Sequence, residues 1–232
     1  MRDRRVAALI PCLDAGRTVG SVVEGVRAFV ETVLVVDDGS ADASVDAAQA
    51  SGAEVLRQPR NLGKGAALRR GFAQLAERGF THVVTLDADG QHLPSEVPGI
   101  LEFSERKPDA LIIGARRRDG VHEIAPIKRF GNDFADGWVE RAGGPALKDS
   151  QSGFRVYPLV ALKEVLRDVR GARFEFESEV VILACRRGVE IDSIDIEVHY
   201  PPPEERHSHY RPWLDTLRII RMVVPFWRGW RN

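Results

Sequence analysis

Apolar runs and amphipathic stretches alternate along the first part of the chain, up to residue 91. Short runs rich in Val, Leu, Ile and Ala predict buried strands at residues 5–11, 32–36, 53–56 and from 81 onward. Apolar residues at helical spacing predict helices between them, at 21–30, 43–51 and 61–78. This alternation is typical of an α/β fold, with a mostly parallel sheet flanked by helices on both faces.

The pattern is looser after residue 91, but strands and helices continue. The predicted elements are helices at 94–107, 127–141, 159–166 and 174–186, strands at 110–114, within 149–157 and at 189–200, and a basic amphipathic helix at 213–230. No internal repeat or linker interrupts the series. We therefore expect one domain over residues 1–232.

Acidic residues follow several of the predicted strands. Asp14 comes after the first strand, Asp37 and Asp38 after the second, and Asp87 and Asp89 after the fourth. Right-handed crossovers place the carboxyl ends of parallel strands at one edge of the sheet, where ligands bind. The sequence therefore predicts a crevice lined by these five side chains.

Asp87 and Asp89 stand one residue apart at the end of an apolar run. Carboxylates in this position can bind a divalent cation, and Mg²⁺ is usually held by one or two carboxylates together with substrate phosphates. Gln91 adds another oxygen donor two residues later. The alternative is that one of the aspartates caps the following helix.

Two further segments at this edge have a functional and a structural interpretation. Asp38, in Asp-Asp-Gly-Ser, could accept hydrogen bonds from a nucleoside, or the segment could be a capped turn. Lys64, in Asn-Leu-Gly-Lys-Gly, stands at a helix start, where N–H groups and a cation favour a phosphate. That segment could equally be a glycine-rich cap with a solvated lysine.

Two basic clusters are candidates for phosphate contacts. Arg116 to Arg118 follow the fifth predicted strand, and we expect one of these guanidinium groups to be functional. Arg206, His207, His209 and Arg211 follow a run of three prolines. Metal–diphosphate chemistry prefers oxygen ligands, so we favour phosphate contact or lid formation over metal binding for the second cluster.

Composition limits the classes of protein that remain. The chain is 44% hydrophobic with a net charge of −1, which gives no support to bulk nucleic-acid binding. Cys12 and Cys185 lack any metal-ligand spacing and fit a reducing compartment. No stretch approaches the ~20 apolar residues of a membrane span. We expect a cytoplasmic protein, and the basic segment 213–230 fits either packing on the domain or lying on the inner face of the cell membrane.

Several segments taken together resemble one family. They are IPCLDAGRTV, VVDDGSADAS, NLGKGAALRRGF, VVTLDADGQHLP, IIGAR and DSQSGFRVY. In this order and spacing they resemble glycosyltransferase family 2, and most closely its polyprenyl- and dolichyl-phosphate sugar transferases. The resemblance implies a GT-A fold of Rossmann-like architecture and transfer of a sugar from a nucleoside diphosphate, with inversion at the anomeric carbon.

The resemblance also assigns roles to individual residues. The residues that match nucleotide-sugar contacts are Pro11, Asp14, Asp38, Lys64, Asp87, Ala88, Asp89 and Arg206. Asp89 and Gln91 match metal ligands, and the implied cofactor is Mg²⁺ or Mn²⁺. Arg116 matches an arginine that contacts phosphate. Asp149 matches a residue that acts as base or positions the acceptor. Where the family has Tyr-Asn-Glu, this chain has Leu13-Asp14-Ala15.

The leading hypothesis is therefore a metal-dependent hexosyltransferase that uses a UDP- or GDP-sugar and a polyprenyl phosphate or other lipid-linked acceptor. Residues 1–115 would form its nucleotide-binding half, 116–200 its acceptor half and 201–232 a basic amphipathic C-terminal segment. One alternative is a nucleotidyltransferase acting on a sugar phosphate, although its glycine-rich loop is replaced here by Pro-Cys-Leu-Asp-Ala-Gly-Arg. Another is a non-catalytic module that binds nucleotide sugars.

Overall fold

Within the residues that the structure describes, seven strands form one mixed sheet at the centre of the molecule. The computed structural model describes residues 3–116, 137, 140, 147, 149–199 and 212–227, with side chains only for 217–226 in the last range. The strands are β1 Val6–Cys12, β2 Thr32–Asp37, β3 Glu54–Arg57, β4 His82–Thr85, β5 Leu111–Arg116, β6 Arg155–Pro158 and β7 Ile191–Ile196.

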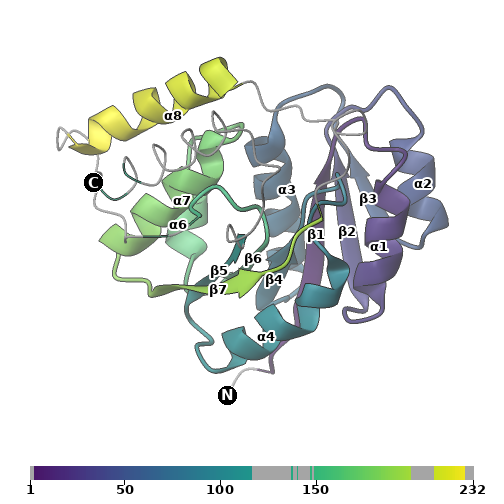
Figure 1. Cartoon of the computed structure of the whole chain (residues 1–232), viewed down its shortest axis with the longest axis horizontal. Coiled ribbons are helices and arrows are strands. Elements are labelled where there is room, and N and C mark those ends of the chain that lie inside the picture. The colour runs from purple at the N-terminus through teal and green to yellow at the C-terminus, as the bar shows by residue number, and fades with distance from the viewer. Residues whose placement is uncertain are drawn as a thin grey trace.

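The strand order is β3-β2-β1-β4-β6-β5-β7 (Figure 1). All pairings are parallel except those of β6, which runs antiparallel to β4 and to β5. In the register, Leu9 of β1 pairs with Leu34 of β2 on one side and with Thr85 of β4 on the other. The mostly parallel sheet predicted from the sequence is confirmed.

Helices cover both faces of the sheet (Figure 1). They are α1 Val19–Arg27, α2 Ser44–Ala50, α3 Lys64–Glu77, the 3₁₀ turn η1 Pro94–Glu96, α4 Val97–Glu105, α6 Lys163–Asp168, α7 Glu175–Arg186 and α8 Pro212–Trp227. Helices α3, α6 and α7 pack on one face, and α1, α2 and α4 on the other. Because successive strand residues point to opposite faces, Leu9 joins the first core and Ile10 the second. Burial on both faces explains why β1, β2, β4 and most of β5 are continuous apolar runs.

Helix α8 lies on α7 as an outer layer (Figure 1). Its buried residues Ile219, Val223 and Phe226 recur at helical spacing and join the core formed by α3 and α7. In the part of the chain that the structure describes, no helix combines the length and the apolar content needed to cross a membrane.

The predicted elements are confirmed wherever the structure describes them, with shifts of a few residues at their ends. One boundary is corrected at the site, because Arg116 is the last residue of β5 and does not follow the strand. The predicted helix at 127–141 lies outside the described residues except for Gly137 and Glu140, which are both helical.

A second correction concerns Pro11, the last residue of the first strand predicted from the sequence. Strand β1 continues through Pro11 to Cys12. The carbonyl oxygen of Leu9 accepts from Leu86 on the β4 side, and that of Cys12 accepts from Asp38 on the β2 side. This alternation directs the Pro11 nitrogen toward β4, beyond the last β1–β4 pair at Leu9. The missing N–H therefore costs no ladder hydrogen bond.

Candidate active site

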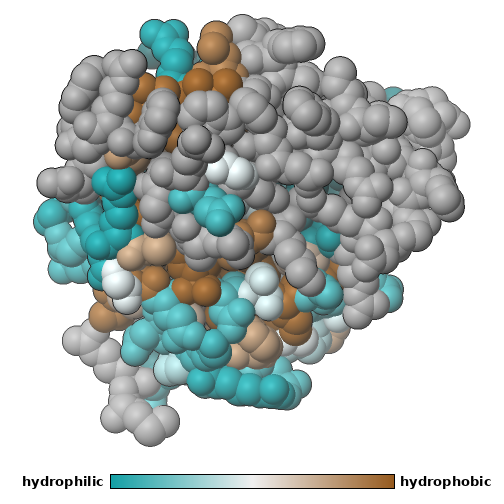
Figure 2. Space-filling view, turned by 60° about the vertical axis from the view of Figure 1, so that its left-hand side comes forward, coloured by the Kyte–Doolittle hydropathy of each residue, from teal (hydrophilic) through white to brown (hydrophobic). Residues whose placement is uncertain are grey.

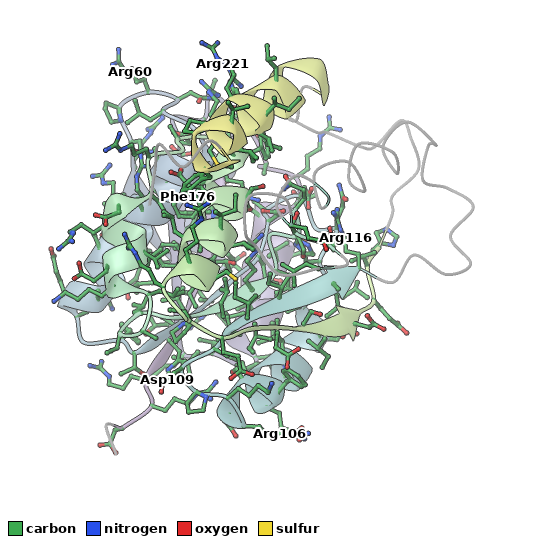
Figure 3. All side chains as sticks on the ribbon, turned by 90° about the vertical axis from the view of Figure 1, so that its left-hand side faces the viewer. Arg60, Arg106, Asp109, Arg116, Phe176 and Arg221 are labelled. Carbon is green, nitrogen blue, oxygen red and sulfur yellow. The ribbon has the colours of Figure 1, made fainter. Side chains whose placement is uncertain are left out.

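The carboxyl ends of β1, β2, β4 and β5 lie at one edge of the sheet, as the sequence predicts. These strands run in the same direction, so the loops that follow them line that edge. The end of β5 carries Arg116, which faces the region beyond the sheet (Figure 3). Among the described residues, the acidic and basic side chains singled out from the sequence are therefore brought to one side of the molecule.

Asp14 ties the loop after β1 to the loop after β2. Its backbone N–H donates to Oγ of Ser40 at 2.9 Å, and its Oδ1 accepts from the backbone N–H of Ala41 at 2.8 Å. Asp14 adopts a left-handed backbone conformation, with φ of 47°, which aspartate tolerates better than most residues. The predicted contact of Asp14 with a nucleotide stays a prediction.

The carboxylate of Asp38 is buried and accepts three hydrogen bonds from the chain. Its Oδ1 accepts from Nε2 of Gln58 at 2.8 Å and from the backbone N–H of Leu62 at 2.7 Å. Its Oδ2 accepts from the backbone N–H of Gly63 at 2.8 Å. A carboxylate offers about four acceptor positions, so about one remains for a ligand. Asp38 thus anchors the loop before α3, and its nucleoside contact stays a prediction.

The glycines before and within the first turn of α3 allow another segment to approach closely. A Cβ on Gly63 would lie 2.3 Å from the carbonyl oxygen of Ala172, and one on Gly65 would lie 2.6 Å from Cβ of Phe176. The N–H of Ala66 donates to the carbonyl of Ala172 at 3.0 Å. The carbonyl oxygen of Ala172 therefore occupies part of the N-terminus of α3, where the sequence predicts a bound phosphate.

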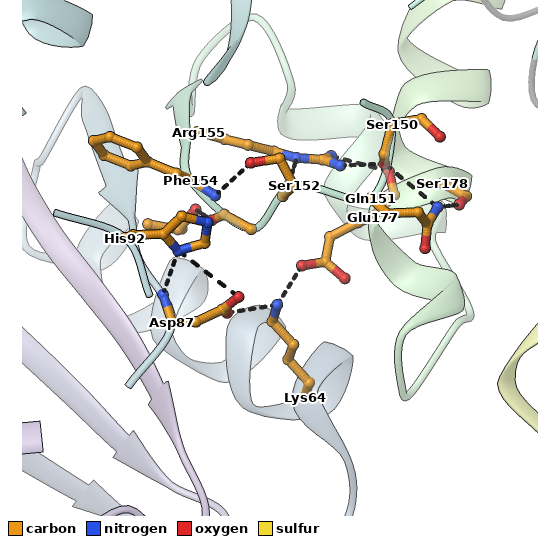
Figure 4. A network of polar contacts seen from close by, with 12 residues as sticks. Lys64, Asp87, His92, Ser150, Gln151, Ser152, Phe154, Arg155, Glu177 and Ser178 are labelled. Carbon is orange, nitrogen blue, oxygen red and sulfur yellow. Dashed lines mark hydrogen bonds and ion pairs between the residues drawn. The ribbon is translucent and has the colours of Figure 1, made fainter. Parts of the chain in front are cut away.

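Lys64 forms two buried ion pairs (Figure 4). Its Nζ lies 2.6 Å from Oδ1 of Asp87 and 2.6 Å from Oε1 of Glu177, and the lysine side chain is 14% exposed. Burial opposes the charge on Lys64, but the two carboxylates outweigh it and raise its pKa. Burial likewise opposes ionisation of Asp87, but the Lys64 ammonium outweighs it and lowers the pKa of Asp87 to about 2. Asp87 is therefore fixed as a carboxylate.

Asp89 has the opposite electrostatic setting. Burial, and then the negative charge of Asp87, raise the pKa of Asp89 to about 6. Its Oδ1 accepts from the backbone N–H of Gln91 at 3.0 Å and its Oδ2 from Nε2 of Gln91 at 2.9 Å. This hydrogen bond brings the Gln91 side chain beside the Asp89 carboxylate.

Asp89 and Gln91 together fit a hard divalent cation. Carboxylate and amide oxygens are ligands for Mg²⁺ or Mn²⁺, and a cation would relieve the repulsion that disfavours ionised Asp89. Within the described ranges, no group of three or more His, Cys, Asp or Glu side chains is placed to hold a metal without help. A metal at Asp89 and Gln91 would therefore need further ligands such as phosphate oxygens or water.

Two contacts fix the backbone between the aspartates. Oγ1 of Thr18 donates to the carbonyl of Ala88 at 2.6 Å. The N–H of Asp87 points at Nδ1 of His92, 3.4 Å away, which requires the imidazole to accept there. Burial lowers the pKa of His92 to about 4, so the ring is neutral. The imidazole thus supports the turn without adding charge.

Arg116 and Asp149 form a bidentate ion pair. Nε of Arg116 donates to Oδ2 of Asp149 at 2.6 Å, and its Nη2 donates to Oδ1 at 2.8 Å. The backbone N–H of Arg116 also points at Oδ2, 3.2 Å away. The Asp149 side chain is fully buried and that of Arg116 is 22% exposed. The fork fixes the direction in which the guanidinium presents its remaining N–H groups.

Arg155 shapes the loop that begins at Asp149. Its buried guanidinium donates to the carbonyls of Ser150 at 2.7 Å, Ser152 at 2.7 Å and Glu177 at 3.0 Å (Figure 4). Gly153 of the same loop lies against the ion pairs, since an added Cβ would be 2.7 Å from the Asp87 carboxylate oxygens. The segment DSQSGFR therefore joins the Arg116 and Asp87 regions.

The structure gives little information on the two remaining predicted site residues, Pro11 and Arg206. Pro11 lies inside β1 at the same sheet edge, and Arg206 and its basic cluster lie outside the described residues. Their predicted nucleotide contacts, like the catalytic roles of Arg116 and Asp149, stay predictions.

Residues 8–155 match the family described as Glycosyl transferase family 2. The matched range contains the end of β1, the Asp87–Asp89 turn, the Arg116–Asp149 pair and the start of β6. The chain belongs to glycosyl transferase family 2. It is accordingly a glycosyltransferase, and the resemblance drawn from its motifs is confirmed.

Curated family 2 relatives include lipid-phosphate transferases. An undecaprenyl-phosphate mannosyltransferase of Micrococcus luteus is 31% identical over 202 residues, covering 83% of this chain and 82% of that protein. A UDP-N-acetylglucosamine–dolichyl-phosphate N-acetylglucosaminyltransferase of Methanococcus voltae is 25% identical over 220 residues, covering 86% and 88%. The similarity to the polyprenyl- and dolichyl-phosphate branch of family 2 is thus confirmed over most of both chains.

Solved structures support the GT-A fold of this family 2 chain. Glucosyl-3-phosphoglycerate synthase of Mycobacterium tuberculosis, solved with Mn²⁺, UDP and glucosyl-3-phosphoglycerate, superposes with a TM-score of 0.71 at 21% identity. The match covers 97% of this chain and 80% of that one. At this identity the likeness concerns the fold alone.

The sequence did not single out three of the residues that shape this site. Glu177 contacts Lys64, His92 approaches Asp87, and Arg155 organises the loop after Asp149. The available signals were weak: His92 directly follows Gln91, and Arg155 ends the DSQSGFR motif. Glu177 carried no signal, because a glutamate in a helix usually faces solvent.

Proposed function

We propose that this family 2 enzyme transfers a sugar, with inversion, from a nucleoside diphosphate to a polyprenyl phosphate in a reaction that requires Mg²⁺ or Mn²⁺. The relatives that act on undecaprenyl phosphate and dolichyl phosphate support this acceptor class. The neighbour solved with UDP and Mn²⁺ supports the donor and metal classes.

The observation that carries the proposal is the bidentate pair of Arg116 and Asp149. A hydroxyl acceptor needs a base with a lone pair directed at its proton. The Asp149 side chain is fully buried, and both of its carboxylate oxygens accept from Arg116. A phosphate acceptor is already anionic and needs no base. The pair therefore suits an enzyme in which Asp149 orients Arg116, and Arg116 contacts the donor diphosphate or the acceptor phosphate.

Asp89 and Gln91 would hold the metal, whose charge would stabilise the departing nucleoside diphosphate. Asp87, kept ionised by Lys64, would lie on the nucleotide side of the same site. Asp38 and Asp14 would border the nucleoside. Asp38 can accept from an N–H of either uracil or guanine, so UDP and GDP are both candidates.

We also propose that the enzyme meets its lipid acceptor with α8 against the membrane. One side of α8 packs on α7, while Leu217, Ile220 and Val224 form a second apolar stripe on the other side. Leu217 is 51% exposed, and the exposed Arg221 lies next to this stripe. Apolar residues of the α8 region lie at the surface in Figure 2, and Arg221 points outward in Figure 3. An apolar stripe beside arginines suits the interface of an anionic membrane.

Calorimetry with UDP and GDP tests the donor and metal parts of the proposal. One of the two should bind in the presence of Mn²⁺ or Mg²⁺ and lose affinity when EDTA is added. Asp89→Ala should lose the metal-dependent affinity. Asp46→Ala, which removes an exposed aspartate on α2, should retain it. Absence of binding by any nucleoside diphosphate would overturn the proposal.

A further inference from the structure

We propose that Glu177 is a positioning residue for the metal–nucleotide site and acts on Asp87 through Lys64. The proposal rests on the function proposed above, because it assigns a role to a residue that supports that site. It concerns a glutamate on α7 that contacts neither of the proposed metal ligands in the described structure.

The three side chains form a short chain of contacts. Lys64 Nζ lies 2.6 Å from Asp87 and 2.6 Å from Glu177, and each residue comes from a different element (Figure 4). Lys64 opens α3, Asp87 follows β4, and Glu177 lies in the first turns of α7. The exposed fraction of the side chain falls from 28% for Asp87 to 14% for Lys64 and 3% for Glu177. Glu177 therefore anchors the ammonium from the protein interior.

The charges explain why this anchor matters. A lysine has three donors on a flexible stem and moves readily toward nearby anions. Because both Glu177 and Asp87 contact the ammonium, Lys64 is held between the two carboxylates. Without the Glu177 charge, only Asp87 would attract it, and the ammonium would be free to follow a bound phosphate. The orientation of Asp87 beside the metal site would then lose its support.

The surrounding backbone keeps the three groups at this separation. Gly65 allows α3 to approach α7 so closely that a Cβ would lie 2.6 Å from Cβ of Phe176, the residue before Glu177. Gly153 allows the loop before β6 to approach Lys64 closely, since a Cβ on Gly153 would lie 2.8 Å from Lys64 Nζ. Two glycines thus permit a contact geometry that any larger residue would disturb.

A buried glutamate in α7 could also serve stability alone, so the test needs a control on the same helix. Glu179 is fully buried and accepts hydrogen bonds from the backbone N–H groups of Arg170 and Gly171. Glu179→Gln removes the same charge from the same helix and keeps an oxygen that can accept these bonds. The two glutamine substitutions therefore differ in whether they affect Lys64.

The experiment measures the affinity of UDP and GDP in the presence of Mn²⁺ by calorimetry, for the full chain and its variants. Groups that orient metal ligands typically contribute about 10- to 100-fold to metal affinity or activity. Glu177→Gln should therefore weaken metal-dependent binding about 10-fold or more, and Glu179→Gln less than about 3-fold, as expected for a group outside that set. In a Lys64→Met background, Glu177→Gln should change the affinity by less than about 2-fold, because residues acting through one contact are not additive.

Glu177→Gln and Glu179→Gln with equal effects, or a Glu177→Gln effect that persists in the Lys64→Met background, would overturn the inference while leaving the proposed function intact. If the wild-type protein binds neither nucleotide, the proposed function fails as well. Lys64→Met leaves two carboxylates facing each other and can prevent folding. Gly153→Ala keeps every charge and should also weaken binding about 10-fold; unchanged affinity in this variant contradicts the inference.

Discussion

The guanidinium of Arg116 holds both carboxylate oxygens of Asp149, with contacts of 2.6 and 2.8 Å. Arg116 is the last residue of β5, and Asp149 opens the loop that leads into β6. This pair joins the end of β5 to the loop before β6, and we propose that Asp149 positions Arg116.

This arrangement predicts how the two residues respond to substitution. Arg116→Lys should lower kcat about 100-fold or more, because a lysine cannot reproduce the planar fork that fixes the charge. Asp149→Asn should lower kcat about 10- to 100-fold but leave the shape of the pH–rate profile unchanged. The double variant should be no slower than Arg116→Lys alone. Loss of the acidic limb of the profile in Asp149→Asn would instead identify Asp149 as the general base.

Asp87 and Asp89 should have opposite effects on the stability of the metal-free protein. A pKa of about 6 means that ionised Asp89 is disfavoured in the folded state. Asp89→Asn should therefore raise the free energy of unfolding by on the order of 1 kcal/mol above pH 6, and the gain should vanish below about pH 4. Asp87→Asn should lower it, because Lys64 loses a buried partner.

Melting curves in EDTA measure both effects. Addition of Mn²⁺ and nucleotide should stabilise the wild type more than Asp89→Asn, because only the wild type keeps the charged carboxylate at the proposed metal site. A metal-free Asp89→Asn protein that melts below the wild type would contradict the electrostatic account of this site.

The carboxylate pair also shows what the sequence allowed us to predict. Asp87 and Asp89 could be recognised because they end an apolar run, and the co-directional strands then fixed where they lie. Lys64 was visible only as a cation at a helix start. Its second partner, Glu177, lies far away in the sequence on a helix that is buried on nearly all sides, and no periodic pattern distinguishes such a glutamate from a solvated one.

The fold was predicted well where local pattern determines it. Strands β1, β2 and β4 are buried on both faces, so their apolar runs mark them clearly. The position of β6 could not be predicted, because its pairing of His82 with Pro158 joins distant parts of the chain. The predicted end of the first strand at Pro11 was wrong. A proline ends a strand only where its nitrogen faces a neighbouring strand that needs the hydrogen bond, and the assembled sheet decides which way the nitrogen faces.

His92 predicts a pH dependence of stability. Burial lowers its pKa to about 4 in the folded protein, whereas an unfolded histidine titrates near 6.5. Between these values only the unfolded state binds the proton, so the titration of His92 should lower the free energy of unfolding by up to roughly 3 kcal/mol as the pH falls from 6.5 to 4, while the protonation of Asp89 acts in the opposite direction over the same range.

Urea unfolding of metal-free protein at several pH values measures this effect. His92→Asn retains an acceptor for the N–H of Asp87 but does not titrate in this range, so its stability should decline less as the pH falls. Parallel pH dependences for the wild type and the variant would contradict the assignment to His92.

The exposed side of α8 predicts membrane binding. Substitution of both Leu217 and Ile220 by Glu should reduce cosedimentation with vesicles that contain phosphatidylglycerol, because it places two charges in the apolar stripe. Phe29→Glu is the matched control, since Phe29 is also about half exposed, at 48%, and follows α1. Equal binding by the wild type and both variants would show that α8 does not contact the membrane.

The central claim is that the acceptor is a lipid phosphate. Its most direct test is transfer of labelled sugar from UDP-glucose, UDP-N-acetylglucosamine or GDP-mannose, with Mn²⁺, to undecaprenyl phosphate and to undecaprenol, which lacks the phosphate. We predict a glycosylated lipid phosphate from one of these donors and no product from the alcohol. Equal transfer to the alcohol, or transfer to neither lipid while a hydroxyl acceptor is glycosylated, would contradict the account.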